Sequence, residues 1–303
     1  MPRFARRLAR ARAAVHGDPI AARDLAEAAV AAADTESQRV AARLVRALVL
    51  ARLGLSEAEA EARACLAYFE GAGDSAGVAE ALIAIGTTQV LAGRPAAADP
   101  VLLRARDLAD GGGTPALRAA ALGLLGLGRS DQGRLDEADA MLRESVGLAL
   151  QAGALPLRML HLGNLGQNLL RMCLAEPTSR WNEARALEAE ACLVEAEAWY
   201  HAVDNRRMLG AIVDNRAQLC LVRGQLARGL HLATEAHELA VAVGDVPTQV
   251  WIALTRARLW HAQGDPDVVI ETIDAALALA EAAGIAGGVA ELRALRAQAA
   301  VLR

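Results

Sequence analysis

A segment of 21 residues that begins and ends with glycine occurs four times in this chain. The copies are GRPAAADPVLLRARDLADGGG (93–113), GRLDEADAMLRESVGLALQAG (133–153), GQLARGLHLATEAHELAVAVG (224–244) and GDPDVVIETIDAALALAEAAG (264–284). The first two start 40 residues apart, and so do the last two. A period of this length is typical of arrays in which each repeat is one supersecondary unit stacked on the next. The sequence therefore predicts one elongated repeat array.

Small and apolar residues follow the opening glycine of each copy at fixed offsets. They stand at +5 (Ala98, Ala138, Gly229, with Val269 as the exception), at +9 (Leu102, Leu142, Ala233, Ile273) and at +12 (Ala105, Ser145, Ala236, Ala276). These offsets fit one face of a helix that starts just after the glycine. The glycine itself is expected to cap the preceding helix in a left-handed conformation. The predicted unit is helix A, a glycine turn, helix B and a glycine-containing loop.

Weaker copies extend the array, and one copy carries an insertion. Gly17, Ala22, Ala26 and Ala29 fit the register, as do Gly54, Ala58, Ala62, Cys65 and Gly73 after one deletion. In the fifth copy, EPTSRWNEARALE follows helix A, and helix B is expected to resume near Ala189. Trp181 of this insertion could pin the loop to the array or meet a partner, and we favour pinning because a large aromatic side chain buries area that a loop otherwise lacks. The prediction is a single array over 1–303 of about seven hairpins (1–34, 37–73, 76–113, 115–153, 155–204, 206–244, 247–284) and a closing helix, 286–302.

Composition agrees with an all-α fold. Hydrophobic residues make up 54% of the chain and aromatic residues only 3%, so alanine and leucine carry the apolar content. Both are strong helix formers. No lysine occurs, which excludes a Schiff-base lysine and the phosphate-binding lysine of a P-loop. The net charge of −4 argues against nucleic-acid binding.

No apolar run approaches the roughly 18 residues that a membrane span needs, so no membrane association is expected. The basic start, MPRFARRLARARAAVHGD, has the look of a transit peptide, but we favour a first repeat helix because apolar residues recur there at helical spacing. The four cysteines are scattered and are expected to be small core residues in a reducing, cytoplasmic compartment: Cys65, Cys173, Cys192 and Cys220.

The repeat resembles that of the tetratricopeptide repeat (TPR) family in a form of about 40 residues, which occurs in bacterial signalling proteins. The match rests on the turn glycine, the alanine of helix B and a small residue in the middle of helix A (Gly86, Gly126, Gly166, Ala217, Ala257). The tryptophan near the start of helix A and the proline after helix B are mostly missing. The resemblance implies a right-handed α-solenoid of antiparallel helical hairpins, a TPR-like superhelix whose concave face is lined by A helices.

The resemblance also implies which residues face that groove. In repeats five to seven they are mostly polar: Asn164, Gln167, Arg171, Asp214, Asn215, Gln218, Trp251, Thr255, Arg258 and His261. Amides can clamp an extended peptide backbone, arginine can hold a carboxylate, and Trp251 can serve as an aromatic anchor. The matching positions of repeats three and four are mostly apolar: Ile83, Thr87, Val90, Leu124 and Leu127. The simpler alternative is that the polar residues lie on solvated faces or between hairpins.

No pattern for catalysis or for a metal is found. HExxH and nucleophile-elbow sequences are absent, and the six histidines are expected to be ordinary surface residues. The glutamates of SEAEAEARA (56–64) are expected to form a solvated helix face with i,i+4 pairs.

The sequence thus predicts a non-enzymatic scaffold or sensor that binds a protein or peptide in a bacterial signalling or transcription-regulatory system, without cofactor or metal. Two alternatives stay open. One is a regulatory domain that binds a small-molecule effector. The other is a self-association module that forms a homodimer.

Overall fold

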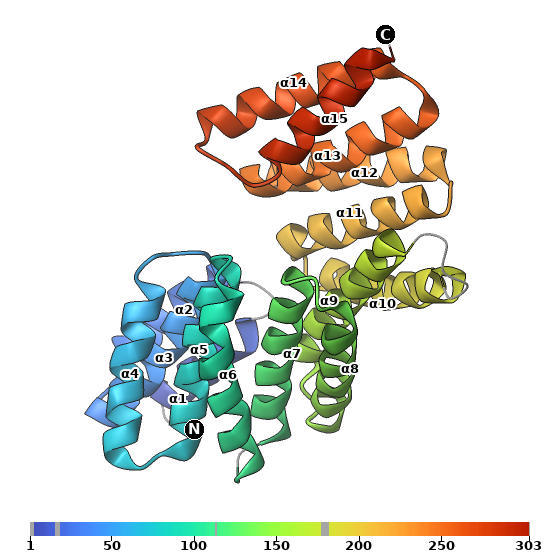
Figure 1. Cartoon of the computed structure of the whole chain (residues 1–303). Coiled ribbons are helices and arrows are strands. Elements are labelled where there is room, and N and C mark those ends of the chain that lie inside the picture. The colour runs from blue at the N-terminus through green and yellow to red at the C-terminus, as the bar shows by residue number, and fades with distance from the viewer. Residues whose placement is uncertain (1–2, 16–18, 113, 177–181, 303) are drawn as a thin grey trace. The chain divides into compact units, whose positions relative to one another are not determined.

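The computed structural model describes residues 3–15, 19–112, 114–176 and 182–302 (Figure 1). Within these ranges it contains fifteen helices and no strand. The helices are α1 (Arg3–Ala14), α2 (Pro19–Val30), α3 (Glu36–Arg52), α4 (Ala58–Ala72), α5 (Ser75–Leu91), α6 (Pro95–Asp110), α7 (Pro115–Asp131), α8 (Leu135–Gln151), α9 (Leu155–Ala175), α10 (Asn182–Ala202), α11 (Arg206–Val222), α12 (Leu226–Ala242), α13 (Val246–Gln263), α14 (Pro266–Ala282) and α15 (Val289–Val301).

The predicted fold class, an all-α TPR-like solenoid of helical hairpins, is confirmed. Odd-numbered helices from α1 to α13 are A helices and even-numbered ones are B helices. The two helices of a hairpin pack against each other, as α5 does with α6, α7 with α8 and α11 with α12 (Figure 1). The basic N-terminal segment forms α1, as expected of a repeat helix.

The chain divides into two compact units, Met1–Asn168 and Leu169–Arg303. We call them the first and the second unit and describe each by itself. The boundary falls within α9, so this helix contributes residues to both units. Gly17 and Trp181, on which two sequence predictions rest, lie outside the described residues.

The turn glycines have the conformation that the repeat predicts. Gly93, Gly133, Gly224 and Gly264 have φ values of 69°, 75°, 69° and 84°. This left-handed region is nearly free of strain only for glycine, which explains why the residue recurs with the repeat. Asp204 takes the same role between α10 and α11 with φ 52°, as aspartate can because its short side chain tolerates this region.

Glycines in the middle of A helices allow close packing inside two hairpins of the first unit. A Cβ added to Gly86 of α5 would lie 2.3 Å from Leu102 Cδ2 of α6, and one added to Gly126 of α7 would lie 2.8 Å from Leu142 Cγ of α8. Both leucines are fully buried and follow their glycine by 16 residues. The mid-helix small residue and the +9 residue of the repeat are therefore partners in one contact.

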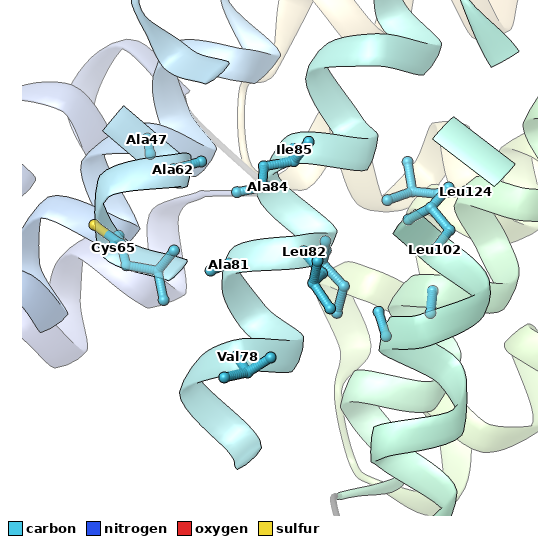
Figure 2. Close-up of a cluster of buried hydrophobic side chains, with 14 of the residues drawn as sticks. Ala47, Ala62, Cys65, Val78, Ala81, Leu82, Ala84, Ile85, Leu102 and Leu124 are labelled. Atoms are coloured by element: carbon cyan, nitrogen blue, oxygen red, sulfur yellow. The ribbon is translucent and has the colours of Figure 1, made fainter. Parts of the chain in front are cut away.

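The core of the first unit is built mainly from alanine, leucine and isoleucine. Figure 2 shows Ala47 of α3, Ala62 and Cys65 of α4 and Leu82 of α5 in one cluster that also includes Leu102 and Leu124. Alanine at these positions lets helices approach closely, while leucine fills the remaining space. The four cysteines are buried free thiols, as expected. Burial raises the pKa of the Cys65 thiol to about 11.

Two details differ from the sequence predictions. Helix α10 begins at Asn182 and not near Ala189, because NEARALEAEAC consists of good helix formers, so much of the insertion lengthens the helix. Glu59 forms the expected i,i+4 pair with Arg63 (Oε1 to Nη2, 2.7 Å). Glu61, however, is only 9% exposed and accepts hydrogen bonds from Arg43 Nε (3.1 Å) and Arg46 Nε (3.0 Å), which join α3 to α4. It is a structural ion-pair residue rather than part of a solvated face.

None of the helices in the described ranges is long and apolar enough to cross a membrane.

Candidate functional site

A hollow of about 470 Å³ lies in the first unit and is lined by the A helices α1, α3, α5, α7 and α9, with residues next to their ends. Three groove positions predicted for repeats three and four, Ile83, Thr87 and Leu124, line it. Among the described residues, none of a B helix contributes to it. In this unit the A helices thus share one concave lining, as the family resemblance implied, and that lining is mainly apolar.

One ion pair joins two distant parts of the lining. Arg12 of α1 donates to both carboxylate oxygens of Glu80 of α5, at 3.1 and 2.9 Å. The two residues are 68 positions apart in the chain, and such two-point pairs hold a defined geometry. Thr87 Oγ1 donates to the Ile83 carbonyl oxygen of its own helix (2.8 Å), so its methyl group is left to face the apolar lining.

Like Thr87, His161 of α9 is a buried polar residue of this lining. Its side chain is 1% exposed, and Nδ1 contacts Ser145 Oγ of α8, which itself donates to the Ala119 carbonyl oxygen (2.7 Å). Because the Ser145 hydroxyl donates its proton to the Ala119 carbonyl oxygen, Nδ1 must carry the imidazole proton and donate a hydrogen bond to Ser145 Oγ. Nε2 is then an acceptor, and no described residue donates to it.

His161 is neutral at physiological pH. Burial, with a contribution from the positive charge of Arg52, lowers the pKa of its imidazole to about 3. Gly123 of α7 makes room for the ring, since a Cβ there would lie 2.3 Å from both Cε1 and Nε2. The expectation that all histidines are surface residues is wrong for His161. The repeat pattern could not reveal it, because residue 161 is not among the groove positions that the family implies.

A second candidate face lies in the second unit, where α11 packs against α13. It contains five of the predicted groove residues: Asp214, Asn215, Gln218, Thr255 and Arg258. Asp214 is 6% exposed, and its Oδ2 accepts a hydrogen bond from Gln218 Nε2 (2.8 Å). Its Oδ1 is buried and has no hydrogen-bond partner. A buried carboxylate oxygen without a donor is costly and therefore marks a position where a ligand could supply one.

The neighbours of Asp214 act on its ionisation in opposite directions. Burial raises the pKa of its carboxyl group to about 6. The Thr255 hydroxyl, the Gln218 amide and the positive charge of Arg258 favour the charged form and so limit this rise. The Thr255 hydroxyl itself donates a hydrogen bond to the Trp251 carbonyl oxygen (3.5 Å). Among the described residues neither Arg258 nor the Asn215 amide has a hydrogen-bond or ion-pair partner.

The other predicted groove residues are placed as follows. Asn164 and Gln167 are half-buried on the part of α9 that belongs to the first unit, whereas Arg171 lies on the part in the second unit. Trp251 of α13 is 45% exposed, and its indole lies beside Gly287 and Gly288 before α15. His261, near the end of α13, is half-buried. Gln218, Thr255 and Arg258 thus act on Asp214, while the α9 residues are divided between units.

Asp214→Asn is expected to stabilise the second unit at pH 8 by about 1–2 kcal/mol, with the lost attraction to Arg258 offsetting part of the gain. The pKa of Asp214 is 3.8 in the unfolded chain and about 6 in the folded chain. The wild type therefore loses stability as the pH rises through this range, because the buried carboxyl group becomes charged. Near pH 4 the difference should vanish. Urea unfolding at both pH values measures it. Asp274→Asn, at an exposed site where Arg296 lowers the pKa, should give no gain at pH 8.

Among the described residues no group of three or more histidine, cysteine, aspartate or glutamate side chains could hold a metal ion. The hollow and the face of α11 and α13 offer apolar surface, hydrogen-bonding groups and fixed charges, which are the features of a binding site. The contact between Ser145 and His161 is buried, and the serine hydroxyl donates its proton to the Ala119 carbonyl oxygen.

The fold defines the class, which is that of TPR-like helical repeat proteins. Solved structures with this fold include the following two. BtubC (BKLC) from P. vanneervenii is 16% identical with a TM-score of 0.56, over 80% of this chain and 92% of that one. A Rap protein in complex with competence and sporulation factor is 11% identical with a TM-score of 0.57, over 99% of both chains. The sequence matches no family model and no curated protein.

Proposed function

We propose that this chain is a non-enzymatic binding module for a protein or peptide in a bacterial signalling or regulatory system. The observation that carries the proposal is the face of α11 and α13. There Asp214 Oδ1 is buried without a hydrogen-bond partner, and the Asn215 amide and the Arg258 guanidinium make no hydrogen bond to a described residue. A buried carboxylate oxygen of this kind costs stability unless a ligand satisfies it.

An extended peptide has the chemistry that this face requires. Its backbone offers a donor and an acceptor to the Asn215 amide, a carboxylate can pair with Arg258, and a backbone N–H or an ammonium group can donate to Asp214 Oδ1. Trp251 adds exposed aromatic surface near the face on α13. Asn164, Gln167, Arg171, Gln218, Thr255 and His261 are proposed to extend the contact.

The likeness to the Rap protein supports the proposal in one respect only. That protein holds competence and sporulation factor on the same fold, so a TPR-like array of this length can carry a bound factor. The buried free thiols suit a reducing compartment, and we propose that the module acts in the cytoplasm.

The double substitution Asn215→Ala/Arg258→Ala is expected to weaken peptide binding at least tenfold, because it removes an amide clamp and a charge-assisted bond. Peptides selected from a random display library on the wild-type chain would be titrated against both proteins by fluorescence anisotropy. Arg293→Ala/Gln298→Ala is the matched control, since both residues are exposed on α15. Equal affinities for the wild type and Asn215→Ala/Arg258→Ala would contradict the proposed face.

Self-association stays the alternative, and light scattering after gel filtration separates it from peptide binding. A dimer that persists in Asn215→Ala/Arg258→Ala, together with a library that enriches no peptide, would favour a self-association module.

A further inference from the structure

We propose that the hollow of the first unit is a separate binding site for a small, neutral, mainly apolar molecule that carries one hydroxyl group, such as an apolar alcohol or phenol. This site goes beyond the proposed peptide-binding function. It lies in the other unit and has a different lining. Its argument rests on the size and chemistry of the hollow and on His161.

The size and lining of the hollow suit a small organic molecule. Its volume of about 470 Å³ is well above that of one large side chain and within the roughly 300–1,000 Å³ of ligand pockets. Val45, Leu48, Ile83, Leu117 and Leu157 line it, from four different helices. Apolar surface of this kind binds an apolar molecule because it removes area from water. The rim is accessible, since Arg12 and Ala13 of α1 are exposed.

The charges of the lining favour a neutral ligand. Arg12 and Glu80 satisfy each other through two hydrogen bonds, so neither is left to select a counter-charge. His161 carries no charge because its ring is buried and lies near Arg52. Arg52 has its own interaction in the protein. Arg52 also lines the hollow, so the titration with 4-octylbenzoate described below tests whether its positive charge selects an anion.

His161 supplies the directional contact. The chain from its Nδ1 through Ser145 Oγ to the Ala119 carbonyl oxygen holds the ring in one tautomer and presents Nε2 as an acceptor. With the residue 1% exposed, this nitrogen is shielded from bulk water and has no donor among the described residues. A hydroxyl group on the ligand meets this need, whereas a wholly apolar ligand leaves the nitrogen unsatisfied.

The test is calorimetric titration of the full chain with 4-octylphenol and with its methyl ether, 4-octylanisole, which has the same apolar body but no donor. We expect one molecule of the phenol to bind per chain and the ether to bind roughly tenfold more weakly. In His161→Phe the two compounds should bind equally. Equal binding by the wild type would overturn the role of His161, and tighter binding of 4-octylbenzoate would overturn the neutral class.

Two substitutions locate the site. Ala120→Trp, on the lining of α7, should weaken phenol binding at least tenfold by filling the hollow. Ala13→Trp, at the exposed rim, should weaken it at least fivefold and cannot disturb the core, so the test survives if Ala120→Trp misfolds. Ala60→Trp, exposed on α4, is the matched control and should bind as the wild type does. Unchanged affinity in both lining variants, or several molecules bound per chain, would place the phenol elsewhere and overturn the proposal.

Ala120→Trp could weaken the binding of a selected peptide and leave the binding of the phenol unchanged. In that case the hollow is a pocket for partner side chains, and the small-molecule proposal fails. The peptide-binding face of α11 and α13 is tested independently by Asn215→Ala/Arg258→Ala, so the two proposals can fail separately.

Discussion

Replacing Leu102 by alanine is expected to lower the free energy of unfolding by about 3–4 kcal/mol, because it deletes a fully buried side chain and leaves a cavity. The cavity would lie over Gly86, whose missing side chain makes room for Leu102. The size of this effect reflects how closely α5 and α6 approach.

The same contact predicts that Gly86→Ala lowers the free energy of unfolding when residue 102 is leucine and raises it when residue 102 is alanine. In the wild type the new Cβ would lie 2.3 Å from Leu102 Cδ2, and this overpacking should cost about 1–2 kcal/mol net of better helix propensity. In the Leu102→Ala background the new methyl group fills part of the cavity, so Gly86→Ala should stabilise by about 1 kcal/mol.

Urea unfolding of the four proteins, followed by circular dichroism, completes this double-mutant cycle. Gly126 and Leu142 in the next hairpin form the matched pair and should behave alike. An effect of Gly86→Ala that is the same with leucine and with alanine at position 102 would show that the two side chains do not share one space.

Acidification is expected to destabilise the first unit through His161. The folded state lowers the pKa of this imidazole to about 3, so between that value and the usual 6.5 the unfolded chain binds a proton that the folded chain excludes. Stability is complete above pH 6.5 and falls as the pH drops below it. Between pH 7.5 and 4.5 this group alone should remove about 2–3 kcal/mol.

His161→Gln isolates that contribution. The glutamine amide can still donate to Ser145 but does not titrate, so the variant should lose about 2–3 kcal/mol less than the wild type over this pH range. Asp214 contributes a pH dependence of the opposite sign, which is present in both proteins and cancels in the comparison. His231→Gln, at an exposed position of α12, should follow the wild type. Coincident pH profiles for the wild type and His161→Gln would falsify the assignment of a buried neutral imidazole.

The candidate sites could be predicted from the sequence only in part. Of the five groove positions in repeats three and four, Ile83, Thr87 and Leu124 line the hollow, because they belong to a helix face that repeats with the unit, whereas Val90 and Leu127 are not part of the lining. The same positions led to Asp214, Asn215 and Arg258, whose role in binding stays a prediction. They did not lead to His161, Glu80 or Arg12. These side chains acquire their partners from helices 16 to 68 residues away, and the repeat carries no signal for such pairs.

The helices and their left-handed glycine turns follow from the sequence alone. They depend on interactions within one hairpin, which the spacing of small and apolar residues specifies. Only the tertiary structure decided that Glu61 is buried, that the insertion lengthens α10 and that the A helices of the first unit enclose a hollow with a neutral histidine. The physical reason is that a few side chains from each of five helices form this lining. Their distances depend on how successive hairpins stack, which no single repeat encodes.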